Sequence, residues 1–386
     1  MFLDITLQKN PKLIDAAIKL HREGKILPDT YVIDMDAFLY NGKIIKEEAD
    51  KYGIKLYFMT KQVGRNPLLG KELMKLGYEG AVAVDYKEAK VLSDNGVKLG
   101  HVGHLVQIPK SSLKELIRRG IDYITVYSVE KAKEIDEVAR DLNITQKIIL
   151  RVIDRNDILY PAQYGGFYLE YLKEAAEEIN KLPNIKIDGV CSFPCFLYDE
   201  EAKRIKETPN VKTVLKGKDI LEDYLKRPLG EINMPSATSV ENMKLISDFG
   251  GTHGEPGHGL TGTTPYGACN DDCVEIPSMV YVTEVSHNLG EESFVYGGGH
   301  YRRSHMENVL VADKNHNRKK LKVEEPSLES IDYYFTLKGN SEVSSTAIMA
   351  FRTQLFVTRS NVAIVKGIKD NKPELVGIYD VFGREV

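Results

Sequence analysis

Short β-branched runs alternate with longer amphipathic segments from residue 28 to about residue 262, and this alternation restricts the folds open to the chain. The amphipathic segments, such as "YKEAKVLSDNG" and "VEKAKEIDEVARDLN", repeat apolar residues at about i, i+3, i+4 and i+7, as helices do. Strands and helices that alternate in one long series form a parallel sheet, and about eight such units predict a (β/α)8 TIM-type barrel. The strand-like runs are "TYVIDMD", "KLYFMT", "GAVAVD", "KLGHVGHLVQI", "YITVYS", "KIILRVI", "IDGVCSF", "GEINM" and "THGEPGHGL".

The pattern changes after about residue 263, where strand-like runs are separated by Gly, Asn, Asp and Pro and helical periodicity is almost absent. We therefore expect a barrel domain over 28–262, a C-terminal mainly-β domain over 263–386, and an N-terminal segment over 1–27 that packs on the β domain. An open doubly wound sheet is the alternative for the first domain. Its dinucleotide-binding form has no support, because no G-x-G-x-x-G motif stands at a strand-to-helix turn.

Composition and charge argue against several classes of partner. A hydrophobic fraction of 42% and a charged fraction of 28% are those of an ordinary soluble globular protein. The net charge of −4 gives no electrostatic reason to expect nucleic acid or an anionic membrane, and we interpret the short run "NRKK" as solvated loop charge. We see no signal peptide and no stretch near the roughly 18 apolar residues that a spanning helix needs. We expect a cytoplasmic protein.

The four cysteines form two C-x3-C pairs, Cys191 with Cys195 and Cys269 with Cys273. This spacing occurs at zinc sites. However, 74 positions separate Cys195 from Cys269, whereas the pairs of a zinc site are usually about 15–20 residues apart. Free thiols in a reducing compartment are therefore favoured over a structural zinc.

Active residues of a barrel lie where its strands end at their carboxyl side. Taken singly, residues at these ends have ordinary explanations: Lys61 can extend to solvent, and "PSATS" can cap a helix. Their combination is harder to explain in that way. The polar and aromatic residues at these ends are Asp34, Asp36, Lys61, Arg151, Ser192, Phe193, Ser236, Thr238, Ser239, Glu255 and His258.

Three of these features match the functional groups of a single cofactor. A desolvated lysine amine, such as that of Lys61, forms a Schiff base with a carbonyl compound. Hydroxyls and free N–H groups at a helix start, as at Ser236, Thr238 and Ser239, bind phosphate, and barrels often carry such a site after their late strands. An acid at a neighbouring strand end, Glu255, can hold a pyridinium N–H. These features together predict pyridoxal phosphate as the cofactor.

The sequence resembles the fold-type III pyridoxal-phosphate enzymes over about residues 28–262, and the whole chain is most similar to their alanine racemase-like, YhfX-type branch. The segments "PDTYVIDMDAFLYN" and "GIKLYFMTKQVGRNP" are similar to the family's opening, where the cofactor lysine ends the first barrel strand; here Lys61 lies 27 positions after Asp34. "GVCSFP", "INMPSATS" and "GEPGHGLTG" resemble the segments that contact the cofactor's ring, phosphate and pyridine nitrogen. The resemblance implies cofactor contacts at Lys61, Arg151, Ser192, Phe193, Ser236, Thr238, Ser239, Glu255, Gly257 and His258, with Phe193 stacked on the ring.

Departures from the family pattern bear on the reaction. Alanine racemases have an arginine at the pyridine-nitrogen position, whereas this sequence has Glu255, as the related decarboxylases do. A carboxylate there favours the protonated ring, which is a stronger electron sink. Arg151 also corresponds to a decarboxylase residue near the ring hydroxyl, and Gln163 falls near an arginine of the racemase motif. The decarboxylase "C-D-G" and "G-A-Y" signatures are not evident, so the proton donor of that reaction is missing.

Racemisation needs an acid or base on each face of the substrate carbon. Lys61, once released from the cofactor, can serve one face, and the resemblance implies that the β domain of a partner subunit supplies the other. The loop "YGGGHYRRSH" is the best candidate, although a surface hairpin with incidental charges is the competing interpretation. Its candidate residues are His300 or Tyr301 as the second base, and Arg302 and Arg303 as ligands of a substrate carboxylate. A metal site through His300 and His305 is an alternative use of the loop, but we expect no metal.

We therefore predict a pyridoxal-phosphate-dependent amino-acid racemase that acts on a small amino acid as a homodimer with a shared active site. A decarboxylase, or a D-amino-acid aldolase or dehydratase of the same fold, is the alternative. A non-catalytic pyridoxal-phosphate carrier is disfavoured by the second domain, which carriers of that kind generally lack. A metal-dependent barrel hydrolase that uses His253, His258 and aspartate residues is the alternative from another class, and it predicts a colourless protein.

Overall fold

The computed structural model describes every residue from 1 to 386, and the chain folds into two compact units. The barrel unit consists of Lys43–Thr60 and Pro67–Gly257. The sheet unit consists of Met1–Gly42, Lys61–Asn66 and His258–Val386. The sheet unit therefore combines both ends of the chain with a short segment that interrupts the barrel sequence.

Eight parallel strands form the barrel: β2 (Lys55–Met59), β3 (Gly80–Ala83), β4 (Leu99–Val102), β5 (Ile121–Val126), β6 (Gln146–Ile153), β8 (Ile185–Cys191), β11 (Glu231–Asn233) and β12 (His253–Gly254). They pair in this order, and the ring closes because β12 pairs with β2. Every residue of β3 and β4 is buried, as expected for parallel strands that are covered on both faces.

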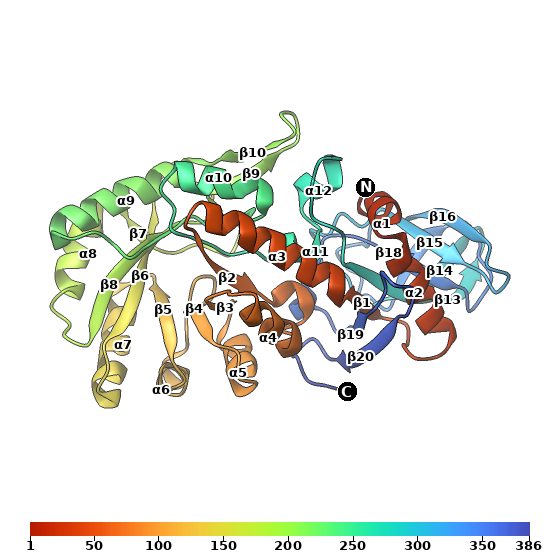
Figure 1. Cartoon of the computed structure of the whole chain (residues 1–386), viewed down its shortest axis with the longest axis horizontal. Helices are drawn as coiled ribbons and strands as arrows, with labels where there is room; N and C mark the ends of the chain where they lie inside the picture. Colours follow the sequence, from red (N-terminus) through yellow and green to blue (C-terminus); the bar gives the residue numbers. More distant parts are fainter. The chain divides into compact units, whose positions relative to one another are not determined.

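Helices surround the strands of the barrel unit (Figure 1). They are α4 (Pro67–Lys75), α5 (Tyr86–Asp94), α6 (Lys110–Arg118), α7 (Val129–Leu142), α8 (Leu172–Ile179), α9 (Pro209–Leu225) and α10 (Val240–Asp248), with α3 (Met35–Lys51) divided between the units after Gly42. The shorter elements are β7 (Phe167–Tyr168), η2 (Leu169–Tyr171), β9 (Phe196–Asp199) and β10 (Arg204–Glu207). Local sequence sets several boundaries: the Ser128 side chain accepts from Lys131 N at the start of α7, and Asn143 ends that helix in the left-handed conformation.

A nine-stranded, mostly antiparallel sheet forms the centre of the sheet unit. In spatial order its strands are β14 (Glu292–Tyr296), β17 (Tyr334–Lys338), β16 (Arg318–Val323), β15 (Asn308–Ala312), β18 (Thr346–Met349), β13 (Met279–Leu289), β1 (Thr30–Asp34), β19 (Asn361–Lys366) and β20 (Glu374–Tyr379). The other elements are α1 (Phe2–Lys9), α2 (Pro11–Arg22), η1 (Lys61–Val63), α11 (His258–Thr261), α12 (Pro265–Cys269) and η3 (Leu355–Val357).

Helices α1 and α2 bury their apolar residues against this sheet. Leu13, Ile14 and Ala17 of α2 belong to one buried cluster with Val280 and Ile348 of strands β13 and β18. The first 22 residues therefore share a hydrophobic core with strands more than 250 positions later in the sequence.

The (β/α)8 barrel followed by a mainly-β domain is confirmed, with corrections to individual strands. The run "TYVIDMD" is not a barrel strand: it forms β1, which pairs with β13 antiparallel and with β19 in parallel in the other sheet. The run "NRKK" is not loop charge, because Arg318–Val323 forms strand β16 between β15 and β17. The eight later runs in the 28–262 region supply the eight barrel strands. None of the helices is long and apolar enough to cross a membrane.

Candidate active site

A buried carboxylate, Glu255, marks the carboxyl end of the barrel strands. The Glu255 Oε1 atom accepts hydrogen bonds from His101 Nδ1 at 2.8 Å and from Asn233 Nδ2 at 2.8 Å. Its backbone N–H donates to Thr238 Oγ1 at 3.2 Å. His101 lies on β4, Asn233 ends β11, and Glu255 follows β12, so three parallel strands bring these groups to one end of the barrel.

Glu255 is held in its charged form. Burial, the largest single effect, raises the pKa of this carboxyl, but the imidazoles of His104, His101 and His253 together hold its pKa well below the usual range. The second oxygen, Oε2, makes no hydrogen bond in the structure and lies 4.0 Å from His104 Nε2. The barrel therefore presents an ionised carboxylate with one acceptor oxygen open.

Arg151 lies on β6 at the same end of the barrel and is 1% exposed. Its Nη1 donates to the Tyr127 hydroxyl at 2.8 Å, and its Nη2 donates to the Gln163 carbonyl at 2.9 Å. Tyr127 in turn donates to the carbonyl of His104. The Arg151 Nε atom is buried without a partner, which leaves one donor of this guanidinium unused. Gln163 contacts Arg151 through its backbone carbonyl, and its side chain makes no contact like that of the arginine found nearby in the racemase motif.

Ser192 and Phe193 follow strand β8 directly. The Phe193 ring contacts the imidazole of His104 edge-on, with centroids 5.7 Å apart, and the ring of Tyr160 at 5.6 Å. The buried Ser192 hydroxyl accepts from Asn210 Nδ2 at 3.1 Å. These contacts fix an aromatic ring and a hydroxyl beside the histidine that faces Glu255.

The loop before helix α10 has an unusual backbone. Ser236 and Ala237 adopt φ of 109° and 52°, and Thr238 and Ser239 are buried. Ser239 is the N-cap residue of α10, but its side chain caps no N–H group and its hydroxyl instead donates to the Ala237 carbonyl at 3.1 Å. The first N–H groups of α10 thus donate no hydrogen bond to the cap side chain, as at helix starts that bind anions.

The remaining predicted residues belong to the sheet unit. Lys61 directly follows Thr60, which follows β2, and it begins η1. His258 begins α11 and donates from Nε2 to the Thr353 carbonyl at 3.0 Å. Burial first, and then the positive charges of Arg352, Lys61 and Arg303, hold the pKa of His258 well below its usual value, so this imidazole is neutral. Gly257 is the last residue of the barrel unit.

The loop 297–305 is tied to the N-terminal part of the sheet unit. The Tyr31 hydroxyl donates to the Gly299 carbonyl at 2.5 Å, and the Tyr281 hydroxyl donates to Asp29, whose carboxylate lies against Gly298. In this loop His300 and Tyr301 are partly buried, whereas Arg302 and Arg303 are exposed. Burial lowers the pKa of His300, and although the Asp332 carboxylate opposes this, the net direction is downward.

The residues fit a pyridine cofactor better than a metal ion. Ligand atoms of His101, His253 and Glu255 lie within 4.8 Å of one another, which is a geometry that a metal could use. Both ring nitrogens of His101 and the Nδ1 of His253 already make hydrogen bonds, however. The buried His253 Nε2 atom has no hydrogen-bond partner, but the pKa of this ring is raised to about 9, so the nitrogen carries a proton near pH 7 and is not a metal ligand in that state. The groups left for a cofactor are Glu255 Oε2, which makes no hydrogen bond, and the Arg151 Nε donor. An acceptor for a ring N–H and a donor for a ring oxygen are what a pyridoxal ring requires.

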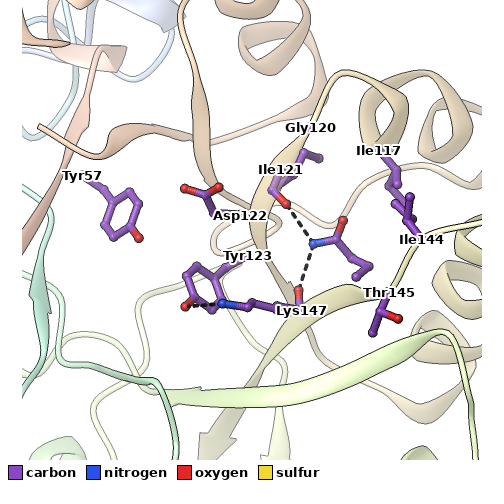
Figure 2. Close-up of a pocket in the computed structure, with 10 residues that line it drawn as sticks. Tyr57, Ile117, Gly120, Ile121, Asp122, Tyr123, Ile144, Thr145 and Lys147 are labelled. Carbon is purple, nitrogen blue, oxygen red and sulfur yellow. Dashed lines mark hydrogen bonds between the residues drawn. The ribbon is translucent and has the colours of Figure 1, made fainter.

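A pocket lies near the amino ends of strands β5 and β6, and Figure 2 shows the residues that line it. This cavity of about 420 Å³ is lined by Tyr57, Asp122, Tyr123, Lys147 and neighbouring residues. Gln146 Nε2 donates to the carbonyls of Ile121 and Lys147, both at 3.0 Å. Because barrel enzymes place their reacting groups at the carboxyl ends of the strands, we do not assign this cavity to the reaction.

The sequence patterns did not reveal most of the groups around Glu255. His101, His104, Asn233 and Tyr127 were not among the predicted residues, although "GHVGH" ends a strand-like run and places two histidines near its tip. His253 was considered only as a metal ligand, and the structure instead places it between Glu231 and Glu255. Their roles depend on which strands are neighbours, and that information appears only in the folded barrel.

Two family models match the chain. The model described as alanine racemase, N-terminal domain, matches residues 33–265, and the model described as YhfX-like, C-terminal domain, matches residues 280–375. An uncharacterized protein of Escherichia coli (strain K12), YhfX, is 43% identical over 391 residues, which cover 100% of both chains.

Two more distant comparisons agree with the fold. The ornithine racemase of Acetoanaerobium sticklandii is 29% identical over 164 residues, which cover 41% of this chain and 42% of the racemase. The crystal structure of D-threonine aldolase from Filomicrobium marinum superposes with a TM-score of 0.68 at 14% identity, covering 92% of this chain and 95% of that one. At that identity the superposition supports the fold alone.

Proposed function

Because this chain belongs to the alanine racemase N-terminal-domain family and carries a YhfX-like C-terminal domain, we propose that it is a pyridoxal-phosphate-dependent amino-acid racemase. The family matches support racemisation, and the observation that most supports the cofactor is the buried, ionised Glu255 at the carboxyl end of the barrel, whose Oε2 makes no hydrogen bond. Pyridoxal phosphate, when bound, supplies the electron sink that makes the proton on the substrate's α carbon removable.

Residues of the barrel unit are proposed to hold the cofactor. Glu255 Oε2 accepts from the ring nitrogen, and Arg151 Nε donates to the ring hydroxyl. Phe193 covers one face of the ring, beside Ser192. The start of helix α10 supplies backbone N–H groups for the phosphate, with the hydroxyls of Ser236, Thr238 and Ser239 around it. Gly257 and His258 are also proposed to contact the cofactor, because "GEPGHG" resembles the family segment at the pyridine nitrogen.

Lys61 is proposed as the lysine that bonds the cofactor and then moves a proton. It stands in the chain directly after Thr60, where the family places that lysine, and it is only partly exposed. Its amine, once free, takes or returns the α proton on one face of the substrate.

The second acid or base is proposed to come from the loop 297–305. His300 is the stronger candidate by charge state, since burial lowers its pKa and leaves a neutral imidazole that can accept a proton near pH 7. Tyr301 is the alternative, and the exposed Arg302 and Arg303 are proposed to bind the substrate carboxylate. We propose that the substrate is a small amino acid and that two copies of the chain complete the site.

Deuterium exchange tests the proposal. Full-length protein with pyridoxal phosphate in D2O is expected to convert one enantiomer of its amino acid into the other and to place one deuterium on the α carbon. Lys61→Ala should abolish both the exchange and the absorbance of the lysine-bound cofactor. Lys71→Ala, an exposed lysine on α4, is the matched control and should change neither. A colourless protein that never responds to pyridoxal phosphate would contradict the proposal.

A lyase of the same fold is the second candidate, and Glu255 favours it. An ionised carboxylate at the ring nitrogen supports the protonated, more electron-withdrawing ring, which decarboxylation also uses. The same D2O experiment separates the two reactions. Release of CO2, an aldehyde or ammonia from the amino acid identifies a lyase, whereas an unchanged carbon skeleton identifies a racemase.

A further inference from the structure

A chain of alternating charges runs through the interior of the barrel unit and ends at Glu255. Lys55, the first residue of β2, donates to Glu231 Oε1 at 2.9 Å. Glu231 Oε2 accepts from His253 Nδ1 at 2.6 Å. The other ring nitrogen, His253 Nε2, lies 3.4 Å from Glu255 Oε1. The chain therefore leads from the amino ends of the strands, where Lys55 is half exposed, to the carboxylate at their carboxyl ends.

Burial makes this chain costly. Glu231 is 0% exposed and His253 is 1% exposed. The interiors of such barrels are ordinarily filled by branched apolar side chains. Buried ion pairs add little net stability compared with apolar residues of the same volume. Stability alone does not explain why three ionisable groups are in contact inside this barrel.

We propose that Glu231 and His253 are positioning residues that keep Glu255 charged and oriented for a ring nitrogen. This inference deepens the proposed function and rests on it for its last step. Glu231 is fully engaged: Lys55 binds one oxygen, and His253 and Thr252 Oγ1, at 3.1 Å, bind the other. Glu231 thereby fixes the orientation of the His253 ring, so that its Nε2 faces Glu255 Oε1 and leaves Oε2 open.

The charge states agree with this geometry. Burial lowers the pKa of His253, but its contacts with Glu231 and Glu255 outweigh that effect and raise the pKa to about 9. Burial raises the pKa of Glu231, but His253 and Lys55 bring it down to about 2. The other titratable rings against His253 are Tyr57 at 5.2 Å and His101 at 6.1 Å. Burial raises the pKa of Tyr57, so its hydroxyl is neutral, and the ring nitrogens of His253 face the carboxylates of Glu231 and Glu255.

The test measures the protonation of His253 directly, in full-length protein labelled with 15N-histidine and without added cofactor. The signal is assigned by its loss in His253→Gln. We expect both ring nitrogens to carry protons at pH 7.5, and we expect Glu231→Gln to lower the pKa of the ring by roughly 1–3 units, the size of the effect of a nearby opposite charge. The matched control is Glu174→Gln, an exposed glutamate on α8, which should leave the pKa of His253 unchanged.

A second measurement uses the protein loaded with 15N-labelled pyridoxal phosphate. The ring nitrogen is expected to be protonated in the unsubstituted protein and to lose that proton at a lower pH in Glu231→Gln. If the role of Glu231 were purely structural, the Glu231→Gln protein that still binds the cofactor would show an unchanged pKa of the ring nitrogen.

Several results would overturn the inference. A neutral His253 at pH 7.5 in the unsubstituted protein would do so, and this measurement stands even if Glu231→Gln fails to fold. A bound metal that EDTA removes, with His253 neutral while it is present, would also overturn it, because the cluster would then be a metal site. A charged His253 in a protein that never binds pyridoxal phosphate would support the charge chain and contradict the proposed function, so the two failures are distinguishable.

Discussion

Gly298 shows how a single residue constrains the loop that carries the candidate second base. Its φ is +126°, a conformation that side chains other than hydrogen rarely adopt, and an added Cβ would lie 1.9 Å from Asp29 Oδ2. The Asp29 carboxylate is itself held by the hydroxyls of Tyr281 and Ser360. The glycine therefore allows the partly buried carboxylate of Asp29 to lie directly on the loop backbone.

Gly298→Ala should consequently destabilise the protein by about 3 kcal/mol or more, because it combines backbone strain with a steric clash. Gly290→Ala is the matched control: this glycine also has positive φ, of +61°, but an added Cβ meets nothing within 4 Å. That substitution should cost about 1 kcal/mol. Urea unfolding followed by circular dichroism measures both, and equal costs for the two variants would show that Asp29 yields to the added methyl group.

Residue-level prediction from the sequence reached the ends of the strands but not the contacts between them. Glu255 stands in a conspicuous turn, "GEPGHG", and Lys61 interrupts an apolar run, so local sequence marks both. Asn233 and His101 look like ordinary residues in their strands, and only the pairing of strands around the barrel brings them to Glu255. Glu231 begins a three-residue strand, and nothing in "GEINM" indicates that its carboxylate is buried and hydrogen-bonded to His253.

Among the elements, α2 illustrates an amphipathic helix whose partner lies far away in the sequence. Its buried residues include Leu13 and Ile14, both 0% exposed, and its outer face carries residues such as Lys19. The apolar face packs on strands β13 and β18 of the sheet unit. The helix therefore covers sheet surface that would otherwise be exposed to water.

Leu13→Ala should destabilise the protein by about 2–5 kcal/mol, since it removes buried methyl groups and leaves a cavity between helix and sheet. The control is Lys19→Ala on the same helix, which loses a surface ion pair with Glu23 that is worth roughly 0–1 kcal/mol. Thermal unfolding of the full chain compares them. If both variants unfold at the same temperature as the unsubstituted protein, the packing of α2 contributes nothing to the stability of the sheet unit.

Strand β1 and strand β16 show why element prediction was incomplete. The run that forms β1 has the apolar, β-branched composition of a barrel strand, and it is buried along its whole length, but between β13 and β19. Periodicity identifies a buried strand without identifying its neighbours. Strand β16, "RKKLKV", is mostly exposed and rich in charged residues, so its sequence does not indicate a strand. Backbone pairing with β15 and β17 stabilises it instead.

At the scale of the whole molecule, the titratable groups with shifted pKa values affect stability in different pH ranges. The pKa of Asp29 is raised to about 6, chiefly by burial, and those of His21, His258 and His300 are lowered, again chiefly by burial. All of these groups have completed the change in their contribution to stability by about pH 7.5, one unit above the usual histidine pKa. The buried cysteines have a pKa raised above their ordinary value of 9.0, so their contribution begins to be lost only as the pH approaches that unfolded value. The interval from about pH 7.5 to about pH 8.5 thus isolates His253.

We expect the free energy of unfolding to fall by about 1 kcal/mol between about pH 7.5 and about pH 8.5. A histidine whose pKa in the folded state is raised, here to about 9, stabilises the folded protein fully below its unfolded value of 6.5, and that contribution is lost as the pH rises through 9. Urea titrations of the full chain at half-unit pH steps measure the slope. His253→Gln should flatten the curve in this interval even if it lowers stability throughout, because a glutamine binds no proton. If the free energy of unfolding of His253→Gln falls with pH as steeply as that of the unsubstituted protein, another group causes the loss. The pH dependence of stability would then give no support for a charged histidine inside the barrel.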